Sequence, residues 1–234
     1  MNGTLYGVGV GPGDPELITI QAVRIIERCE VVAVPKTGDG EGVALQIARG
    51  AVPNLADKQL IELFIPMTRD KALLNRNYDE AAGELAELLR QGKNIAFLTL
   101  GDSTIYSTYT YVHKRIVAMG LSAQFVAGVP SFCAVAARLN IPLTEGAQPL
   151  HVLPASYKGA DSGLDMSGTK ILMKTGKAFD TVKQQLKDRG MLKSAQMVQK
   201  CGMEGERVFH DIDAADDGAS YFSVIVVKEE EVQL

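Results

Sequence analysis

Residues 7–15 read Gly7-Val8-Gly9-Val10-Gly11-Pro12-Gly13-Asp14-Pro15 and lie almost at the N-terminus. They overlap a short run of apolar residues and glycines that predicts a buried strand over residues 5–10, and a helical pattern begins just beyond them. Glycine-rich turns between a strand and a helix are typical of open α/β sheets, which bind ligands at the carboxyl ends of their strands. The stretch therefore predicts an α/β fold with a ligand-binding loop after its first strand.

Two common nucleotide sites do not fit this loop. The third glycine of a G-x-G-x-x-G fingerprint is missing, whether the spacing is counted from Gly7 or from Gly9. No acidic residue that would bind a ribose follows the second predicted strand, which runs into Pro35. Pro12 and Pro15 lack an N–H group and fix φ, so the loop is expected to be a stiff edge and not a phosphate cradle. A tight turn without a ligand is the alternative.

Composition excludes several classes of partner. The chain has 234 residues, of which 46% are hydrophobic, so it can bury a full core in one large domain or two small ones. A formal net charge of −4 gives no general attraction to nucleic acid or to anionic membranes. No apolar run approaches the ~18 residues of a membrane span, and no signal-peptide pattern opens the chain. We therefore expect a globular protein with neither nucleic acid nor membrane as a partner.

The cysteines indicate a reducing compartment. Cys29, Cys133 and Cys201 are widely separated and form no C-x-x-C pair, so neither a disulfide framework nor a zinc site is expected. The three histidines are isolated as well. The sequence thus predicts no metal site and a location in the cytoplasm.

Strand and helix patterns alternate along the chain. Helical spacing of apolar residues predicts helices at 20–29, 43–49, 70–91, 105–119, 132–139 and 178–190. Apolar runs predict strands at 5–10, 31–34, 60–65, 94–100, 123–127, 150–154, 170–174, 196–201 and 221–228. Alternation of this kind predicts a largely parallel sheet. We expect two α/β lobes, 1–120 and 121–234, with a cleft between them.

Two further loops follow strands in the same way as the opening loop. Gly101-Asp102-Ser103-Thr104 comes directly after the strand at 94–100, and Gly128-Val129-Pro130-Ser131 comes after the strand at 123–127. Ser131 is a plausible N-cap for the helix that follows. All three loops are therefore expected at ligand-binding strand ends.

These three loops carry a resemblance to a known family. Their letters are GVGPGDPELIT at 9–19, LGDSTIYS at 100–107 and GVPS at 128–131, with IPL following at 141–143. In order and separation they resemble the loops of the tetrapyrrole methyltransferases, which use S-adenosylmethionine and build cobalamin and sirohaem. The resemblance covers essentially the whole chain.

Within the family, the chain most resembles the branch that methylates carbon 20 of precorrin-2 or cobalt-factor II. The letters that carry this are LYGVGVGPGDPEL at 5–17, FIPMTRD at 64–70, FLTLGD at 97–102, YSTY at 106–109 and YFS at 221–223. Uroporphyrinogen methylases have a Tyr-Asp pair after the second strand, where this chain has Val34-Pro35-Lys36. The resemblance implies a homodimer, with the tetrapyrrole on the first-lobe side of the cleft and the cofactor on the second-lobe side.

The resemblance also implies which residues hold the cofactor. They are Pro12 from the first loop, Leu100, Gly101, Asp102 and Ile105 from the second, Pro130 and Ser131 from the third, and Met173, Lys174 and Cys201 from the second lobe. Asp102 has the best physical case, because a carboxylate accepts hydrogen bonds from ribose or amino groups and attracts a cation. An aspartate that caps the helix expected from Ile105 is the alternative. Met173 and Cys201 also suit a structural role as core residues.

The macrocycle bears several carboxylates, so its site needs basic residues around an apolar trough. The candidates for substrate binding are Gly11, Gly13, Asp14, Lys36, Arg69, Arg76, Tyr106 and Arg138. Each basic candidate also fits an ordinary solvated side chain. No residue is assigned as a catalytic base, because the cofactor already carries a good leaving group.

One residue departs from the family pattern. The second loop of the family usually reads Gly-Asp-Pro, and here Ser103 replaces the proline. A serine leaves φ free, so we expect a less rigid loop and an effect on cofactor affinity more than on reaction type.

Three other functions remain open at this stage. The chain fits a family member that methylates a different tetrapyrrole carbon or the modified histidine of a translation factor. It also fits a module that binds a tetrapyrrole or nucleotide without catalysis. A nicotinamide oxidoreductase is the third, and the absent third glycine and ribose acid count against it.

Overall fold

The computed structural model describes residues 1–38, 40–157, 160–215 and 221–229, and it divides into two compact units, Met1–Pro130 and Ser131–Leu234. The division falls after Pro130, later than the boundary expected at residue 120. The strand at Ser122–Val126 pairs in parallel with the strand at Thr4–Gly9, so it belongs to the first unit.

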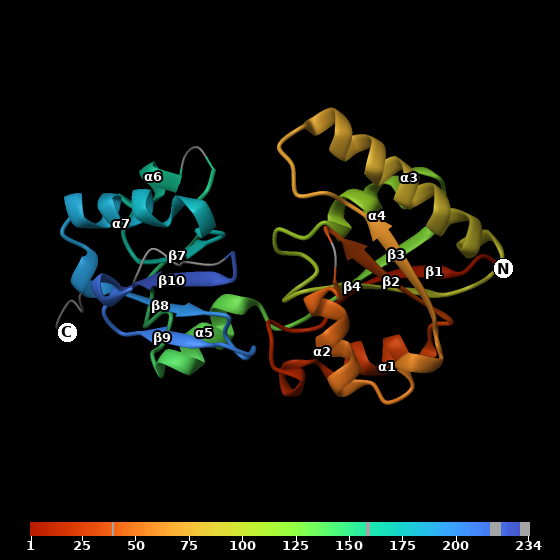
Figure 1. Cartoon of the computed structure of the whole chain (residues 1–234), viewed down its shortest axis with the longest axis horizontal. Coiled ribbons are helices and arrows are strands. Elements are labelled where there is room, and N and C mark those ends of the chain that lie inside the picture. The colour runs from red at the N-terminus through yellow and green to blue at the C-terminus, as the bar shows by residue number, and fades with distance from the viewer. Residues whose placement is uncertain (39, 158–159, 216–220, 230–234) are drawn as a thin grey trace. The chain divides into compact units, whose positions relative to one another are not determined.

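The first unit is built on a five-stranded parallel sheet (Figure 1). Its strands are β1 Thr4–Gly9, β2 Val31–Lys36, β3 Gln59–Phe64, β4 Ile95–Thr99 and β5 Ser122–Val126, in the spatial order β3-β2-β4-β1-β5. Every paired strand runs parallel to its neighbour, which confirms the parallel sheet predicted from the alternating pattern.

Helices cover both faces of this sheet. They are α1 Ile20–Arg28, α2 Val43–Ala51, α3 Lys71–Arg90 and α4 Tyr109–Ala118, with short 3-10 turns at Pro15–Leu17 and Leu55–Asp57. Apolar side chains of α1 and α2 pack on one face of the sheet, and those of α3 and α4 pack on the other (Figure 1). Two separate cores result, one on each side.

Tyr109 joins two strands at the centre of the first unit. Its fully buried hydroxyl donates to the Gln124 carbonyl at 2.7 Å and lies 3.3 Å from the Leu5 carbonyl, and so bridges β5 and β1. The ring occupies the space beside Gly7, where a Cβ atom would lie 2.1 Å from two ring carbons. Glycine is therefore required at this point of β1.

The second unit contains a mixed sheet. Its strands are β6 Leu150–Pro154, β7 Thr169–Met173, β8 Ala195–Gln199, β9 Arg207–Phe209 and β10 Ser223–Val227, in the order β6-β7-β10-β8-β9. Among the described strands of this unit, β6 and β7 pair in parallel and the other pairs are antiparallel. Its helices are α5 Ser131–Leu139, α6 Ala160–Gly163 and α7 Phe179–Asp188, with short 3-10 turns at Gly176–Ala178, Leu192–Ser194 and Ile212–Ala214. Among the helices of the described ranges, none is long and apolar enough to cross a bilayer.

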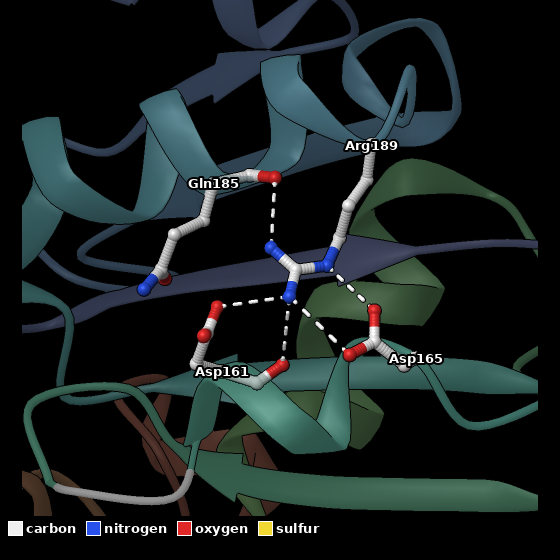
Figure 2. A network of polar contacts seen from close by, with 4 residues as sticks. All are labelled: Asp161, Asp165, Gln185 and Arg189. Atoms are coloured by element: carbon white, nitrogen blue, oxygen red, sulfur yellow. Dashed lines mark hydrogen bonds and ion pairs between the residues drawn. The ribbon is translucent and has the colours of Figure 1, made fainter.

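Arg189 clamps the segment around α6 to the end of α7 (Figure 2). Its Nε lies 2.7 Å from a carboxylate oxygen of Asp165, and its Nη2 lies 3.0 Å from a carboxylate oxygen of Asp161. Nη1 donates to the backbone carbonyl of Gln185 at 3.3 Å. The hydrogen bond from Arg189 and its positive charge hold the pKa of Asp165 below its ordinary value.

Arg189→Ala should lower the thermal unfolding midpoint of the second unit by a few degrees, because both carboxylates lose their partner. The difference from wild type should shrink in about 1 M salt, which screens exposed ion pairs. It should also shrink below about pH 4, because a carboxylate with a lowered folded pKa contributes stability that is lost as pH falls through that value. Circular dichroism would measure the midpoints, with Lys193→Ala as the control. A loss unaffected by salt and pH would contradict an electrostatic clamp.

Candidate functional site

The order of the first sheet places a topological switch point between β1 and β4. These strands are neighbours, yet α1, which follows β1, packs on one face, and α4, which follows β4, packs on the other. The two connections therefore leave the sheet in opposite directions from adjacent carboxyl ends. In open α/β sheets, ligands bind at such topological switch points.

The loops after β1 and β4 meet backbone to backbone at this switch point. Gly11 and Gly101 form an antiparallel bridge. The Gly101 N–H donates to the Gly11 carbonyl at 2.8 Å, and the Gly11 N–H donates to the Gly101 carbonyl at 3.2 Å. Both glycines have positive φ, 82° and 73°, a conformation that L side chains rarely adopt. The bridge extends the pairing of β1 and β4 beyond the ends of both strands.

The loop after β5 packs against the same bridge. A Cβ atom on Gly128 would lie 2.2 Å from the Gly101 carbonyl oxygen, and a Cβ atom on Gly9 would lie 2.8 Å from the Gly128 Cα. Three backbone segments thus approach one another without side chains between them. The structure brings the three predicted loops together at one edge of the sheet.

Asp102 lies at the junction of the second and third loops and is almost fully buried. Its Oδ1 accepts hydrogen bonds from the Thr104 N–H, at 2.8 Å, and from the Thr104 hydroxyl. Its Oδ2 accepts from the Gly128 N–H at 2.8 Å. Burial acts to raise the pKa of Asp102, but these three hydrogen bonds outweigh it and lower the pKa below its ordinary value.

The charge of Asp102 is consequently kept at neutral pH without a cation beside it. All three donors are neutral groups, and no ion pair to Asp102 occurs within the described ranges. An ionised carboxylate held in this way attracts a cationic ligand. This arrangement suits a ligand that carries a positive charge.

The helix-cap alternative for Asp102 is wrong. The helix expected from Ile105 begins at Tyr109, and the Ser107 hydroxyl accepts from the Tyr109 N–H at 3.1 Å. Tyr106 has a φ of 48°, which interrupts any helix between Asp102 and Ser107. Asp102 instead caps the local turn at Thr104 and binds the third loop.

Asp14 of the opening loop has a local structural contact. Its Oδ1 accepts from the Glu16 N–H at 2.9 Å and so begins the 3-10 turn at Pro15–Leu17. Pro12 and Gly13 beside it are buried. Of the predicted residues in this loop, Asp14 is the one whose side chain is partly exposed.

The basic candidates fall into two kinds. Lys36 pairs with Glu62 at 2.5 Å, and Arg138, on α5 of the second unit, pairs with Glu206 at 2.5 Å. Arg69 follows β3 and Arg76 lies on α3, and both are exposed without an ion pair to another described residue. Tyr106, in its left-handed conformation, is 45% exposed beside the Asp102 loop.

The second unit brings its predicted cofactor residues to one edge of its own sheet. Met173 ends β7 and Cys201 lies just beyond β8, and both strands run antiparallel to β10, so their carboxyl ends share an edge. Lys174 has a φ of 57°, and burial lowers the pKa of its ammonium group. Backbone strain of this kind concentrates at functional sites.

Several polar residues at the same edge were not singled out from the sequence. The Thr175 hydroxyl, the Gln199 amide nitrogen and the Ser223 hydroxyl are buried without a hydrogen-bond partner in the described chain. Gln199 and Ser223 are opposite each other in the β8–β10 ladder. A hydroxyl or amide within a strand looks like any other solvent-facing residue in the sequence, so no pattern marked them.

Comparison with protein families gives a match over most of the chain. Residues 4–214 match the family described as "Tetrapyrrole (Corrin/Porphyrin) Methylases".

Curated proteins of this family are similar in sequence. The chain is 31% identical to a cobalt-precorrin-2 C(20)-methyltransferase of Salmonella typhimurium, over 98% of both chains. It is 37% identical to a probable cobalt-precorrin-2 C(20)-methyltransferase of Methanocaldococcus jannaschii, over 73% of this chain and 72% of that one. It is also 34% identical to the cobalamin biosynthesis protein CobIJ of Mycobacterium tuberculosis, over 96% of this chain; here it spans about half the relative, 46% of its length.

Solved structures share the fold. A cobalt precorrin-4 methyltransferase superposes with a TM-score of 0.73 at 20% identity, covering 96% of this chain and 94% of that one. A uroporphyrin-III C-methyltransferase of Thermus thermophilus, complexed with S-adenosylhomocysteine, superposes with a TM-score of 0.70 at 17% identity, covering 97% and 98%. Both confirm the predicted fold class.

Proposed function

The chain belongs to the tetrapyrrole (corrin/porphyrin) methylase family, and on that premise we propose that it transfers a methyl group from S-adenosylmethionine to carbon 20 of precorrin-2 or cobalt-factor II, in cobalamin biosynthesis. The choice of substrate rests on the relatives from Salmonella typhimurium and Methanocaldococcus jannaschii, whose names specify this carbon. The choice of cofactor rests above all on Asp102, an ionised carboxylate at a switch point that has only neutral partners.

The residues of the three loops fit such a cofactor. S-adenosylmethionine supplies a methyl group on a positively charged sulfonium, which is already a good leaving group. Asp102 provides the negative charge that attracts this cation, and the close contact of Gly9, Gly101 and Gly128 holds together the three loops that carry the proposed cofactor residues. The chain therefore acts mainly by binding and orienting the two reactants, with no base required.

We assign the cofactor to Pro12, Leu100, Gly101, Asp102, Ile105, Pro130, Ser131, Met173, Lys174 and Cys201. The residues from Pro12 to Ser131 lie in the three loops. Met173, Lys174 and Cys201 share one edge of the second sheet. In this proposal the first unit binds the tetrapyrrole and carries the loop residues that contact the cofactor, and the second unit contributes the remaining cofactor contacts.

The macrocycle carries carboxylates, which we assign to the basic candidates. Arg69 and Arg76 have exposed guanidinium groups that can each bind a carboxylate through two hydrogen bonds. Lys36 and Arg138 would first have to leave Glu62 and Glu206, which makes them weaker candidates. Gly11, Gly13, Asp14 and Tyr106 complete the proposed substrate side. The enzyme would act in the cytoplasm as a homodimer.

Two assays test this function. Calorimetry with S-adenosylhomocysteine should show binding to the purified chain, and no binding would overturn the proposal. Anaerobic incubation with labelled S-adenosylmethionine and either metal-free precorrin-2 or cobalt-factor II should then place the label on carbon 20 of one of them, as located by NMR. Label on another carbon would indicate a different methylase, and cofactor binding without transfer to any precorrin would indicate a non-catalytic binding protein.

A further inference from the structure

We infer that Ser103 is a positioning residue, whose hydroxyl holds the β4 loop against the end of β5 and thereby keeps the Asp102 carboxylate in place for the cofactor. This inference rests on the proposed function, because it concerns how the same site is organised. The resemblance described above implies a proline at this position, so the restraint that Ser103 places on the loop has a different physical origin.

The side chain of Ser103 makes a polar contact with the end of β5. It is fully buried, and its hydroxyl donates to the Val126 carbonyl at 3.0 Å. Val126 is the last residue of β5 and therefore sits in the rigid sheet. The hydrogen bond fixes the loop that follows β4 to a strand two places away, because β1 lies between β4 and β5.

Asp102 and Thr19 bind the same segment as Ser103, residues 126–128. Asp102 accepts from the Gly128 N–H at 2.8 Å, two residues after the carbonyl that Ser103 binds. Thr19 donates to the Ala127 carbonyl between them at 3.3 Å. The connector 126–128 is therefore held by three side chains from the first and second loops. Because Ser103 and Asp102 are adjacent and bind the same connector, a shift at Ser103 also changes the distance from Asp102 to Gly128.

Loss of the hydroxyl affects Asp102 in a specific way. Without Ser103, the loop loses its tie to Val126, and the Val126 carbonyl loses a buried donor. The Gly128 N–H contact, which helps to lower the pKa of Asp102, then becomes longer or less populated. Cofactor binding should weaken, and the acid limb of its pH profile should move upward. Loss of a residue that only fills space would leave the pH profile of binding unchanged.

The test measures binding of S-adenosylhomocysteine by calorimetry between about pH 4 and 8. Ser103→Ala should weaken binding about 3- to 10-fold, the effect of one hydrogen bond. Ser103→Pro should bind closer to wild type, because proline restrains φ directly. The matched control is Ser194→Ala, which removes a serine hydroxyl that donates to the Met191 carbonyl at 3.1 Å in the second unit. The control should bind as wild type does.

A double-mutant cycle with Asp102→Asn identifies the route of the effect. If Ser103 acts through Asp102, then Ser103→Ala should change affinity less than about 2-fold when Asp102→Asn is already present. Additive losses, or a Ser103→Ala affinity and pH profile equal to those of wild type, would overturn the inference. If Ser103→Ala does not fold, the affinity and pH profile of Ser103→Pro decide the question. A loss of affinity in Ser103→Pro as large as that in Asp102→Asn would contradict the inference. Absence of binding by the wild type would instead reject the proposed function.

Discussion

Replacement of Asp102 by asparagine should weaken binding of S-adenosylhomocysteine by about 10- to 100-fold, the range for a buried charged hydrogen-bonding group of about 1–3 kcal/mol. The amide has the same shape, but it removes the negative charge and presents an N–H group to either the Gly128 or the Thr104 donor. A buried donor is then left unpaired. Calorimetry at neutral pH would measure the loss.

The pH dependence should separate the charge of Asp102 from its shape. The pKa of Asp102 is lowered in the folded protein. The stabilising effect of the ionised carboxylate is therefore fully present above the ordinary pKa of about 4, and it is lost as the pH falls through the folded pKa. Wild-type binding should thus stay level from neutral pH down to about pH 5, and the variant should lack the decrease at lower pH.

Asp211→Asn is the matched control, because Asp211 also accepts a backbone N–H, from Asp213 at 2.9 Å, and it is not among the predicted site residues. It should bind as wild type does. Equal affinities of Asp102→Asn and wild type would remove Asp102 from the site.

Gly128→Ala should have the largest effect on the packing of the three loops. The new methyl carbon would lie 2.2 Å from the Gly101 carbonyl oxygen and 2.8 Å from the backbone of Gly9, so both loops must move apart. Overpacking of this kind costs about 1–3 kcal/mol, and here the displaced atoms are backbone, which cannot rotate away. Thermal unfolding should shift downward, and binding of S-adenosylhomocysteine should fall below detection.

Gly83→Ala is the control for this substitution. Gly83 lies inside α3, where an added Cβ meets nothing within 4 Å, so alanine should stabilise the helix by up to about 1 kcal/mol. It should leave binding unchanged. A Gly128→Ala protein with normal stability and affinity would contradict the close packing of the three loops.

Much of the first unit could be predicted from local patterns. The helix expected at 20–29 is observed at Ile20–Arg28, and the helix expected at 70–91 is observed at Lys71–Arg90, with Asp70 as its N-cap. Both have a strong apolar stripe and a clear start signal. The strand ends that carry the three loops were also predicted to within a few residues, because apolar runs end sharply at glycine.

The features that the sequence did not predict correctly depend on tertiary contacts. The helix expected from residue 105 starts at Tyr109, because Tyr106 adopts a positive φ that no propensity indicates. β9, at Arg207–Phe209, was missed, since three residues cannot display an alternating pattern. Likewise, the pairing of Lys36 with Glu62 joins residues on neighbouring strands, and spacing along the chain carries no information about it.

The contact between Gly7 and Tyr109 means that substitutions at these two positions, far apart in the sequence, depend on each other. Since any Cβ at Gly7 would overlap the tyrosine ring, neither position can change on its own without a clash or a lost bridge between β1 and β5. Among relatives, a larger residue in place of Gly7 should therefore occur only with a smaller one in place of Tyr109. Covariation of these two positions across a sequence alignment would record this constraint.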